Sequence, residues 1–113
     1  MASIWIVDDV RCRPGMGRQF LDAYMRDYAP GAVARGMTLA HRMVEPAYWT
    51  GDVPNRITLV WAVPDAGTVW QTKFMARQDP SVERWWKDAD AFLVSRERRI
   101  MADAEDVETL ADV

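Results

Sequence analysis

Apolar and polar residues follow two different periods along the chain, which predicts both strands and helices. Segments 4–11, 38–45 and 56–63 are rich in β-branched and apolar residues, and each stops at turn-forming residues, as strands do. The segment 56–63 is the clearest of them, with apolar residues on both faces. A fourth segment, 94–101, crowds four charges before Ile100-Met101, which indicates a last strand at a sheet edge or a dimer rim.

Helical spacing of apolar residues occurs in three other segments. Residues 17–28 repeat apolar side chains every three or four positions, and we expect this helix to end before Pro30-Gly31. A second helix opens at Asp65, a candidate N-cap, and runs to about residue 78. Its aligned row consists of Ala66, Trp70, Phe74 and Arg77. A third begins at Asp79-Pro80, an N-cap followed by a proline in the first turn.

The order of these elements predicts one α+β domain with a ferredoxin-like sheet. Strand, helix, strand, strand, helix, strand is the order of a split βαβ unit, and 113 residues suffice for one domain. We place this domain at residues 1–101. Residues 102–113 contain five acidic residues and no basic one, which predicts an acidic C-terminal tail, with Val107 and Leu110 as a possible short docking helix.

Several stretches resemble the NIPSNAP family. They are the Pro14-Gly15 turn, LVWAV at 59–63, ARQDP at 76–80 and LVSRERRI at 93–100, which together span about residues 4–101. The resemblance implies a dimeric α+β barrel: a four-stranded antiparallel sheet with helices on one face and a second subunit on the other. It also implies a ligand cleft between sheet and helices. Other members of the superfamily are antibiotic biosynthesis monooxygenase-like oxygenases, polyketide cyclases, isomerases and haem-binding enzymes.

The amino-acid composition argues against some classes of partner and favours others. With 14 basic and 17 acidic residues the net charge is −3, which argues against nucleic acid as a partner. Six Trp and seven Met are a heavy apolar load for so small a domain, which favours a homodimer. One Cys and one His exclude a structural metal site. We expect no membrane partner and a cytoplasmic location, because no apolar stretch approaches the length of a membrane span.

Four residues are candidates for catalysis. His41 has the side chain whose ordinary pKa lies nearest neutrality, and we expect it to face inward on a central strand, with Leu39 and Met43 on the same side. Asp8 and Asp9 are adjacent on a strand, so one of them faces the cleft. Tyr24 would offer a hydroxyl as an acid or an oxyanion donor. The alternatives are a packed His41, and a structural ion pair at either aspartate.

Aromatic and apolar residues supply the candidates for substrate binding. Tyr48 and Trp49 lie in the long connection 46–54, which has the character of a lid. Trp61, Tyr28 and Met43 are the other candidates, since flat aromatic walls bind flat ligands. Cys12 lies between Arg11 and Arg13, which would favour a thiolate, but we expect it to be structural.

The resemblance, taken with these candidate residues, implies a cofactor-independent small-molecule enzyme. By resemblance, it would be a cyclase, isomerase or monooxygenase that transfers protons on a hydrophobic aromatic intermediate, polyketide or indolic, of bacterial specialised metabolism. No cofactor is expected. The alternative is a non-catalytic small-molecule or haem-binding protein, or an assembly protein, in which His41 would be the axial ligand if haem is bound.

Overall fold

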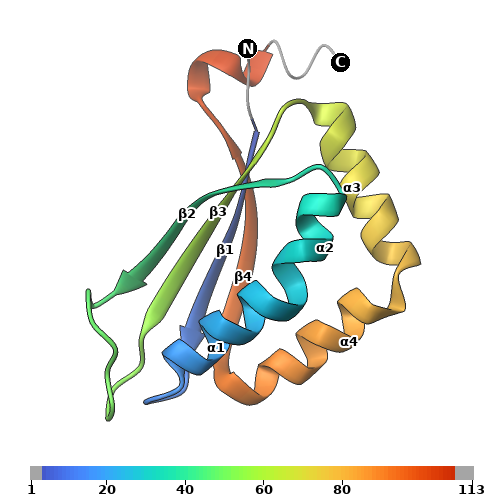
Figure 1. Ribbon diagram of the computed structural model, residues 1–113. Coiled ribbons are helices and arrows are strands. Elements are labelled where there is room, and N and C mark those ends of the chain that lie inside the picture. Colours follow the sequence, from blue (N-terminus) through green and yellow to red (C-terminus); the bar gives the residue numbers. More distant parts are fainter. Residues whose placement is uncertain (1–3, 109–113) are drawn as a thin grey trace.

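A four-stranded antiparallel sheet, covered on one face by helices, forms the domain (Figure 1). The computed structural model describes residues 4–108. The strands are β1 (Ile4–Cys12), β2 (Thr38–Glu45), β3 (Arg56–Val63) and β4 (Leu93–Ala102), in the spatial order β2-β3-β1-β4. The helices are α1 (Gly17–Ala23), η1 (Tyr24–Tyr28), α2 (Ala29–Ala34), α3 (Ala66–Gln78) and α4 (Pro80–Ala89). Short turns, η2 (Asp90–Phe92) and η3 (Ala104–Asp106), flank β4. The predicted ferredoxin-like fold is confirmed.

The core lies between the sheet and the helices. Ile57, Leu59 and Trp61 alternate along β3 and are completely buried on this side, as period-two spacing requires. Phe20 of α1 is equally buried against them. On the other face of β3, the intervening residues are only half-buried, so this face of the sheet stays open in the single chain.

The first helical segment continues past the predicted stop at Pro30-Gly31, so that prediction is wrong. A π-helical turn, η1, separates α1 from α2, and the amide of Ala29 donates to the carbonyl oxygen of Tyr24, five residues back. The hydrogen-bond register therefore changes just before Pro30, which then stands in the first turn of α2. Proline is tolerated there because the first-turn amides have no partner within the helix.

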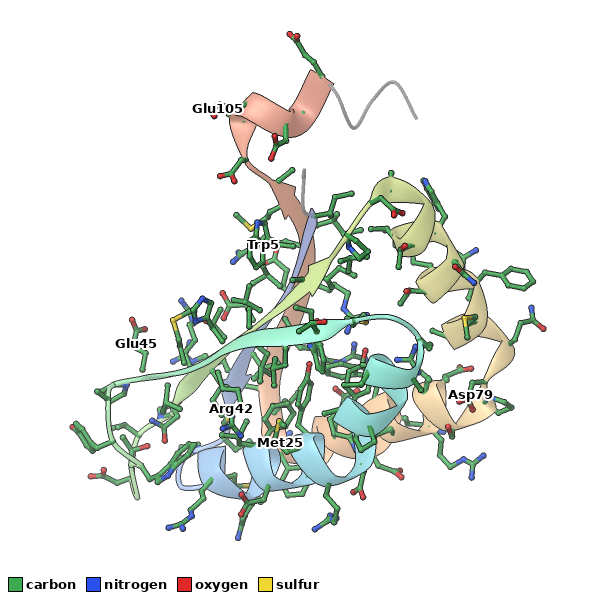
Figure 2. The ribbon with its side chains drawn as sticks, turned by 45° about the horizontal axis from the view of Figure 1, so that its top comes forward. Trp5, Met25, Arg42, Glu45, Asp79 and Glu105 are labelled. Carbon is green, nitrogen blue, oxygen red and sulfur yellow. The ribbon has the colours of Figure 1, made fainter. Side chains whose placement is uncertain are left out.

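Both predicted starts of the later helices are confirmed. The carboxylate of Asp65 accepts from the amide of Thr68, and that of Asp79, at the corner between α3 and α4, accepts from the amide of Ser81 (Figure 2). The aligned row of α3 does not face the core, however. Trp70 and Phe74 in that row are 68% and 64% exposed. The buried side chains of α3 are instead Val69 and Thr72.

A β-bulge in β2 overturns the predicted facing of His41. Leu39 pairs with Trp61 and His41 with Val60, so Ala40 is the extra residue. Because of this residue, Leu39 packs on the helical side, whereas His41 and Met43 lie on the open face. The strand β2 is also an edge strand of the sheet and not a central one.

At the other edge of the sheet lies β4, as predicted. Beyond it, Glu105 lies in the turn η3, away from the helical layer (Figure 2). Of the predicted docking helix, Val107 is exposed and Leu110 lies outside the described residues. None of the helices in residues 4–108 has the length and apolar character of a membrane span.

Candidate functional site

A buried carboxylate occupies the centre of the sheet face that the helices cover. Asp8 is 2% exposed, and its neighbours on the same face of β1, Ile6 and Val10, are apolar and buried. Directly opposite on β4 is Arg98, because the register of the two strands pairs these residues. Its Nε donates to Oδ1 of Asp8 at 2.6 Å and its Nη2 donates to Oδ2 at 2.8 Å. The two side chains thus form a bidentate ion pair, the strongest geometry for this pair of groups.

Two tyrosines and a tryptophan complete the network. Both tyrosines come from η1, with ring centroids 4.9 Å apart. The Tyr24 hydroxyl donates to Oδ2 of Asp8 at 2.8 Å and accepts from Nε1 of Trp61 at 2.6 Å. The Tyr28 hydroxyl accepts from Nη2 of Arg98 at 2.7 Å. Burial, and then the charge of Asp8, raise the pKa of Tyr24 well above its ordinary value, so Tyr24 stays a neutral hydrogen-bond donor.

Arg98 keeps its charge and has unused donors. Burial alone would lower the pKa of Arg98, but its hydrogen bonds to Asp8 and the charge of that carboxylate outweigh burial and raise it. Within residues 4–108, Nη1 of Arg98 donates to no protein atom. Oδ1 of Asp8 accepts only one of these hydrogen bonds. The pair therefore retains both donor and acceptor capacity for a ligand.

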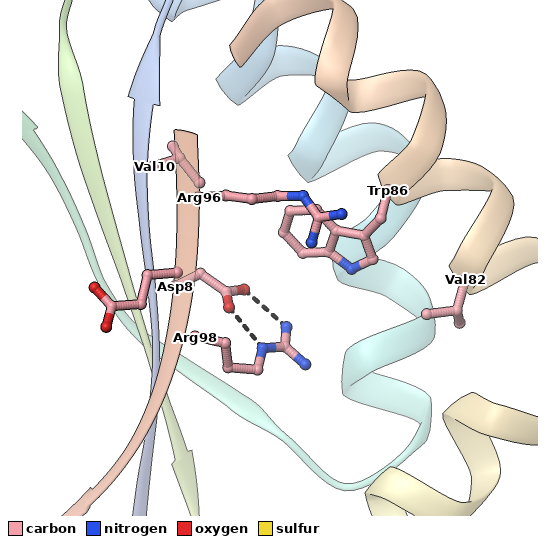
Figure 3. Close-up of a pocket in the computed structure, with 7 residues that line it drawn as sticks. Asp8, Val10, Val82, Trp86, Arg96 and Arg98 are labelled. Atoms are coloured by element: carbon pink, nitrogen blue, oxygen red, sulfur yellow. Dashed lines mark hydrogen bonds and ion pairs between the residues drawn. The ribbon is translucent and has the colours of Figure 1, made fainter. Parts of the chain in front are cut away.

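A cavity of about 260 Å³ opens onto this ion pair between α4 and β4 (Figure 3). Asp8 and Arg98 lie on its sheet side, and Trp86 comes from α4. The guanidinium carbon atoms of Arg96 and Arg98 lie 5.0 and 5.7 Å from a ring centroid of Trp86. Val10 and Val82 supply apolar lining. The cavity thus combines an aromatic wall with the buried carboxylate of Asp8 and two cations, and Glu97 also lines it.

Of the predicted catalytic residues, Asp8 and Tyr24 are brought together and Asp9 is separated from them. Asp9 points to the open face, where its carboxylate lies 3.5 Å from Nη2 of Arg99 and 3.7 Å from Nε of Arg56. Successive residues of a strand face opposite sides, which resolves the choice between the two aspartates. Asp8 is the carboxylate at the cavity.

His41 and Met43 lie on the open face, away from the Asp8 network. His41 lines a depression of about 450 Å³ there, together with Trp5, Val60 and Arg99. The side chain of His41 is exposed, and among the residues that the structure describes none forms a second wall over it. The residues present therefore do not enclose a haem at His41.

The predicted lid is folded against α1 and does not line the cavity. Side-chain Oδ1 of Asn55 accepts from the amide and the hydroxyl of Thr50, at 3.1 and 2.9 Å, and these bonds hold the loop. Trp49 packs against Gly17 at the start of α1, and Tyr48 is 66% exposed. Trp61 is completely buried and belongs to the network and the core. Of the predicted substrate-binding residues, Tyr28 contacts two residues that line the cavity, Arg98 and Trp86.

Arg96, Arg98 and Trp86 line the cavity but were absent from the sequence-based candidates. Arg98 was hidden within the charge run of the last strand, and Trp86 within the helical spacing of α4. The sequence signal for Arg98 is its spacing. Arg96, Arg98 and Ile100 occupy every second position of the strand, so all three lie on one face. Burial raises the pKa of the Cys12 thiol to about 11, which disfavours a thiolate despite the flanking arginines and agrees with the structural role expected for this residue. Within residues 4–108, no cluster of His, Cys, Asp or Glu is suited to a metal ion.

Comparison with solved structures places this fold among known ones. A NIPSNAP family protein from Agrobacterium tumefaciens has a TM-score of 0.70 at 14% identity, over 90% of this chain and 88% of that one. A NIPSNAP domain protein from Burkholderia xenovorans has 0.68 at 15% identity, over 89% and 94%. A putative antibiotic biosynthesis monooxygenase from Nitrosomonas europaea has 0.59 at 10% identity, over 90% of both chains.

These likenesses show the fold and confirm the expected similarity to NIPSNAP and monooxygenase-like structures. No protein-family model matches the sequence. No curated protein matches it either.

Proposed function

We propose that this protein is a cofactor-independent enzyme that transfers protons on a small aromatic carbonyl compound bound in the cavity at Asp8. The observation that carries the proposal is the Asp8–Arg98 pair, a buried carboxylate and a guanidinium with spare hydrogen-bonding capacity beside an aromatic wall. Burying such a pair seldom adds stability over well-packed apolar residues, so its presence under the helices favours a chemical role.

The first step is removal of a proton from carbon next to the carbonyl group. Oδ1 of Asp8 accepts this proton, and the electron pair of the C–H bond moves to form an enolate. Nη1 of Arg98 donates to the enolate oxygen, which carries the developing negative charge. Tyr24 stays protonated throughout and keeps Asp8 in position. Return of the proton to another atom of the ligand completes an isomerisation.

Cyclisation and oxygenation begin with the same enolate, so the three predicted reaction types share this step. One of the similar structures is called a putative antibiotic biosynthesis monooxygenase, which supports this class of chemistry. Trp86 supplies the wall for the aromatic ring. A cavity of about 260 Å³ suits one or two fused rings, polyketide or indolic, of bacterial specialised metabolism.

The open sheet face supports the homodimer as part of the same proposal. Exposed Met43 and Met101 lie on it, and a second sheet packed there would bury them, as in the dimeric barrel that the fold suggests. We place the reaction in the cytoplasm, where a free thiol such as that of Cys12 stays reduced.

The test is hydrogen exchange on an aromatic ketone. The protein is incubated in D2O with 1-tetralone, and NMR follows loss of the signal of the α-hydrogen. We expect exchange above the buffer rate, and a loss of about 100-fold in Asp8→Asn, the usual effect of removing a general base. Asp9→Asn is the matched control. The Asp9 carboxylate lies on the other face of the sheet, so this substitution should leave the exchange rate unchanged. Exchange at the buffer rate with wild type, or equal loss in both variants, contradicts the proposal.

A binding protein without catalysis is the second candidate. The observation that favours it is that Asp8 already accepts three hydrogen bonds from the protein. Titration of wild type and Trp86→Leu with aromatic ketones, followed by tryptophan fluorescence, separates the two functions. Saturable quenching that Trp86→Leu weakens, without hydrogen exchange in the wild type, supports binding alone.

A further inference from the structure

A second cavity lies on the other side of Arg98, and its charged lining has one sign. It has a volume of about 220 Å³ and lies between α3, the end of α2 and the sheet. Four of its lining side chains are cations and none is an acid; the cations are Arg35, Lys73, Arg77 and Arg98. A cleft lined by one sign of charge concentrates counter-ions of the other sign.

Three of these cations have no carboxylate partner in the part of the chain that the structure describes. Arg98 pairs with Asp8, but Arg35, Lys73 and Arg77 take part in no ion pair within residues 4–108. Moreover, Nε of Arg35 is buried and has no hydrogen-bond partner there. A buried donor without an acceptor is costly, so an oxygen atom of a ligand in the cavity that Arg35 lines would be a favourable partner for this nitrogen.

Arg35 is fixed in place by its surroundings. Its backbone carbonyl oxygen accepts from the hydroxyl of Thr72 at 2.9 Å, which ties the end of α2 to α3, beside it in Figure 1. Its guanidinium carbon lies 5.7 Å from the ring centroid of Tyr28, and that of Arg98 lies 5.8 Å from the same centroid. The two guanidinium groups are therefore positioned around one ring before any ligand arrives.

The acid whose pKa responds to the charge of Arg35, Asp79, already has hydrogen-bond partners of its own. Asp79, at the corner between α3 and α4, feels the charge of Arg35, but its Oδ1 accepts from the amide and the hydroxyl of Ser81, at 2.9 and 2.7 Å. In the described part of the chain, no ion pair joins Asp79 to the cavity. The positive charge of the cavity is thus left for a ligand.

We propose that this second cavity binds an oxyanion, the carboxylate or phosphate group of the ligand whose ring lies against Trp86. Guanidinium groups suit both oxyanions, because their parallel N–H bonds match two oxygen atoms. Arg98 lines both cavities and so stands between the two parts of the ligand. The link between the two cavities rests on the proposed function. With that link, the substrate is an acidic aromatic compound.

Calorimetric titration tests oxyanion binding without relying on turnover. The probes are inorganic phosphate and acetate, at constant ionic strength set with chloride, against wild type, Lys73→Gln and Arg77→Gln. Arg77 is exposed, so its substitution leaves the core intact. Arg18→Gln is the charge-matched control, since Arg18 is exposed on α1 and lines neither cavity. We expect saturable binding of one probe, weakened about fivefold or more by each cavity variant and unchanged by the control.

The outcomes separate this inference from the proposed function. Absence of saturable binding of both probes, or equal weakening in Arg18→Gln, overturns the oxyanion cavity even if 1-tetralone exchanges its hydrogens. Specific oxyanion binding without exchange leaves the cavity in place and removes the enzyme. Preference for phosphate or for acetate identifies which group the ligand carries.

Discussion

Removal of the Arg98 guanidinium tests whether the buried network is as costly to break as its geometry indicates. In Arg98→Met, a side chain of similar length lacks the two guanidinium donors to Asp8, whose side chain is only 2% exposed. Leaving a buried charge without its partner costs about 3 to 5 kcal/mol. Since the Arg98 side chain is 38% exposed and water screens that end, we take about 3 kcal/mol as the expected loss.

An exposed pair of the same geometry is the matched control. Arg26 also makes two hydrogen bonds to a carboxylate, at 3.0 and 2.9 Å to Asp27, but the two side chains are 71% and 43% exposed. The substitution Arg26→Met should therefore leave the free energy of unfolding unchanged within error. Urea unfolding at pH 7, followed by tryptophan fluorescence and far-UV circular dichroism, gives this free energy for each variant.

A double-mutant cycle then assigns the loss to the ion pair. In an Asp8→Asn background no carboxylate remains to be stranded, so Arg98→Met should cost at least about 2 kcal/mol less than in wild type. Our reasoning is refuted if Arg98→Met costs no more than Arg26→Met, or if its cost is the same in both backgrounds. Either result would mean that packing, and not charge, dominates at this position.

Three further perturbations probe other parts of the structure. Tyr24→Phe strands Nε1 of Trp61 and removes a donor to Asp8, so unfolding measurements should show a loss of about 2 to 3 kcal/mol. The pKa of the Cys12 thiol rises from 9.0 to about 11 on folding, which stabilises the protein below pH 9 and is lost as the pH rises towards 11. Between pH 8 and 10.5, wild type should therefore lose up to about 2 kcal/mol more than Cys12→Ala, and an equal decline in both would contradict this cause. Addition of haem should give no Soret shift that His41→Ala abolishes, because His41 is exposed on the open face of one subunit and the second sheet of the proposed homodimer would pack on that face; a shift lost in this variant would restore the haem-binding alternative.

Local patterns predicted most of the secondary structure because each signal acts within a few residues. The bounds of β2 and β3 are as predicted, and so are the caps at Asp65 and Asp79. The stop expected at Pro30-Gly31 failed because the effect of a proline depends on whether its missing amide would have been used. The π-helical turn before Pro30 has no distinct composition, so the sequence did not reveal it.

The face of the sheet on which a side chain lies was predictable only where the strand is regular. In β1, simple alternation correctly separates Asp8 from Asp9. In β2, one bulged residue, Ala40, transfers His41 and Met43 to the open face, and the local sequence carries no turn or glycine signal for it. Arg98 required more still: the pairing of β1 with β4, about ninety residues apart, decides that it meets Asp8.

The topology by itself does not explain the polar network at its centre. Similar structures share this fold at 14 or 15% identity, so the arrangement of strands and helices tolerates almost complete exchange of side chains. A leucine in place of Asp8 would satisfy the packing beneath Tyr24 without the desolvation of a carboxylate. In this chain a carboxylate occupies that position on β1. Two tyrosines of a π-helical turn and an arginine of the edge strand β4 form the network that holds it beside a cavity. A buried network of this kind is an unfavourable way to gain stability, which supports a functional role for Asp8 and Arg98.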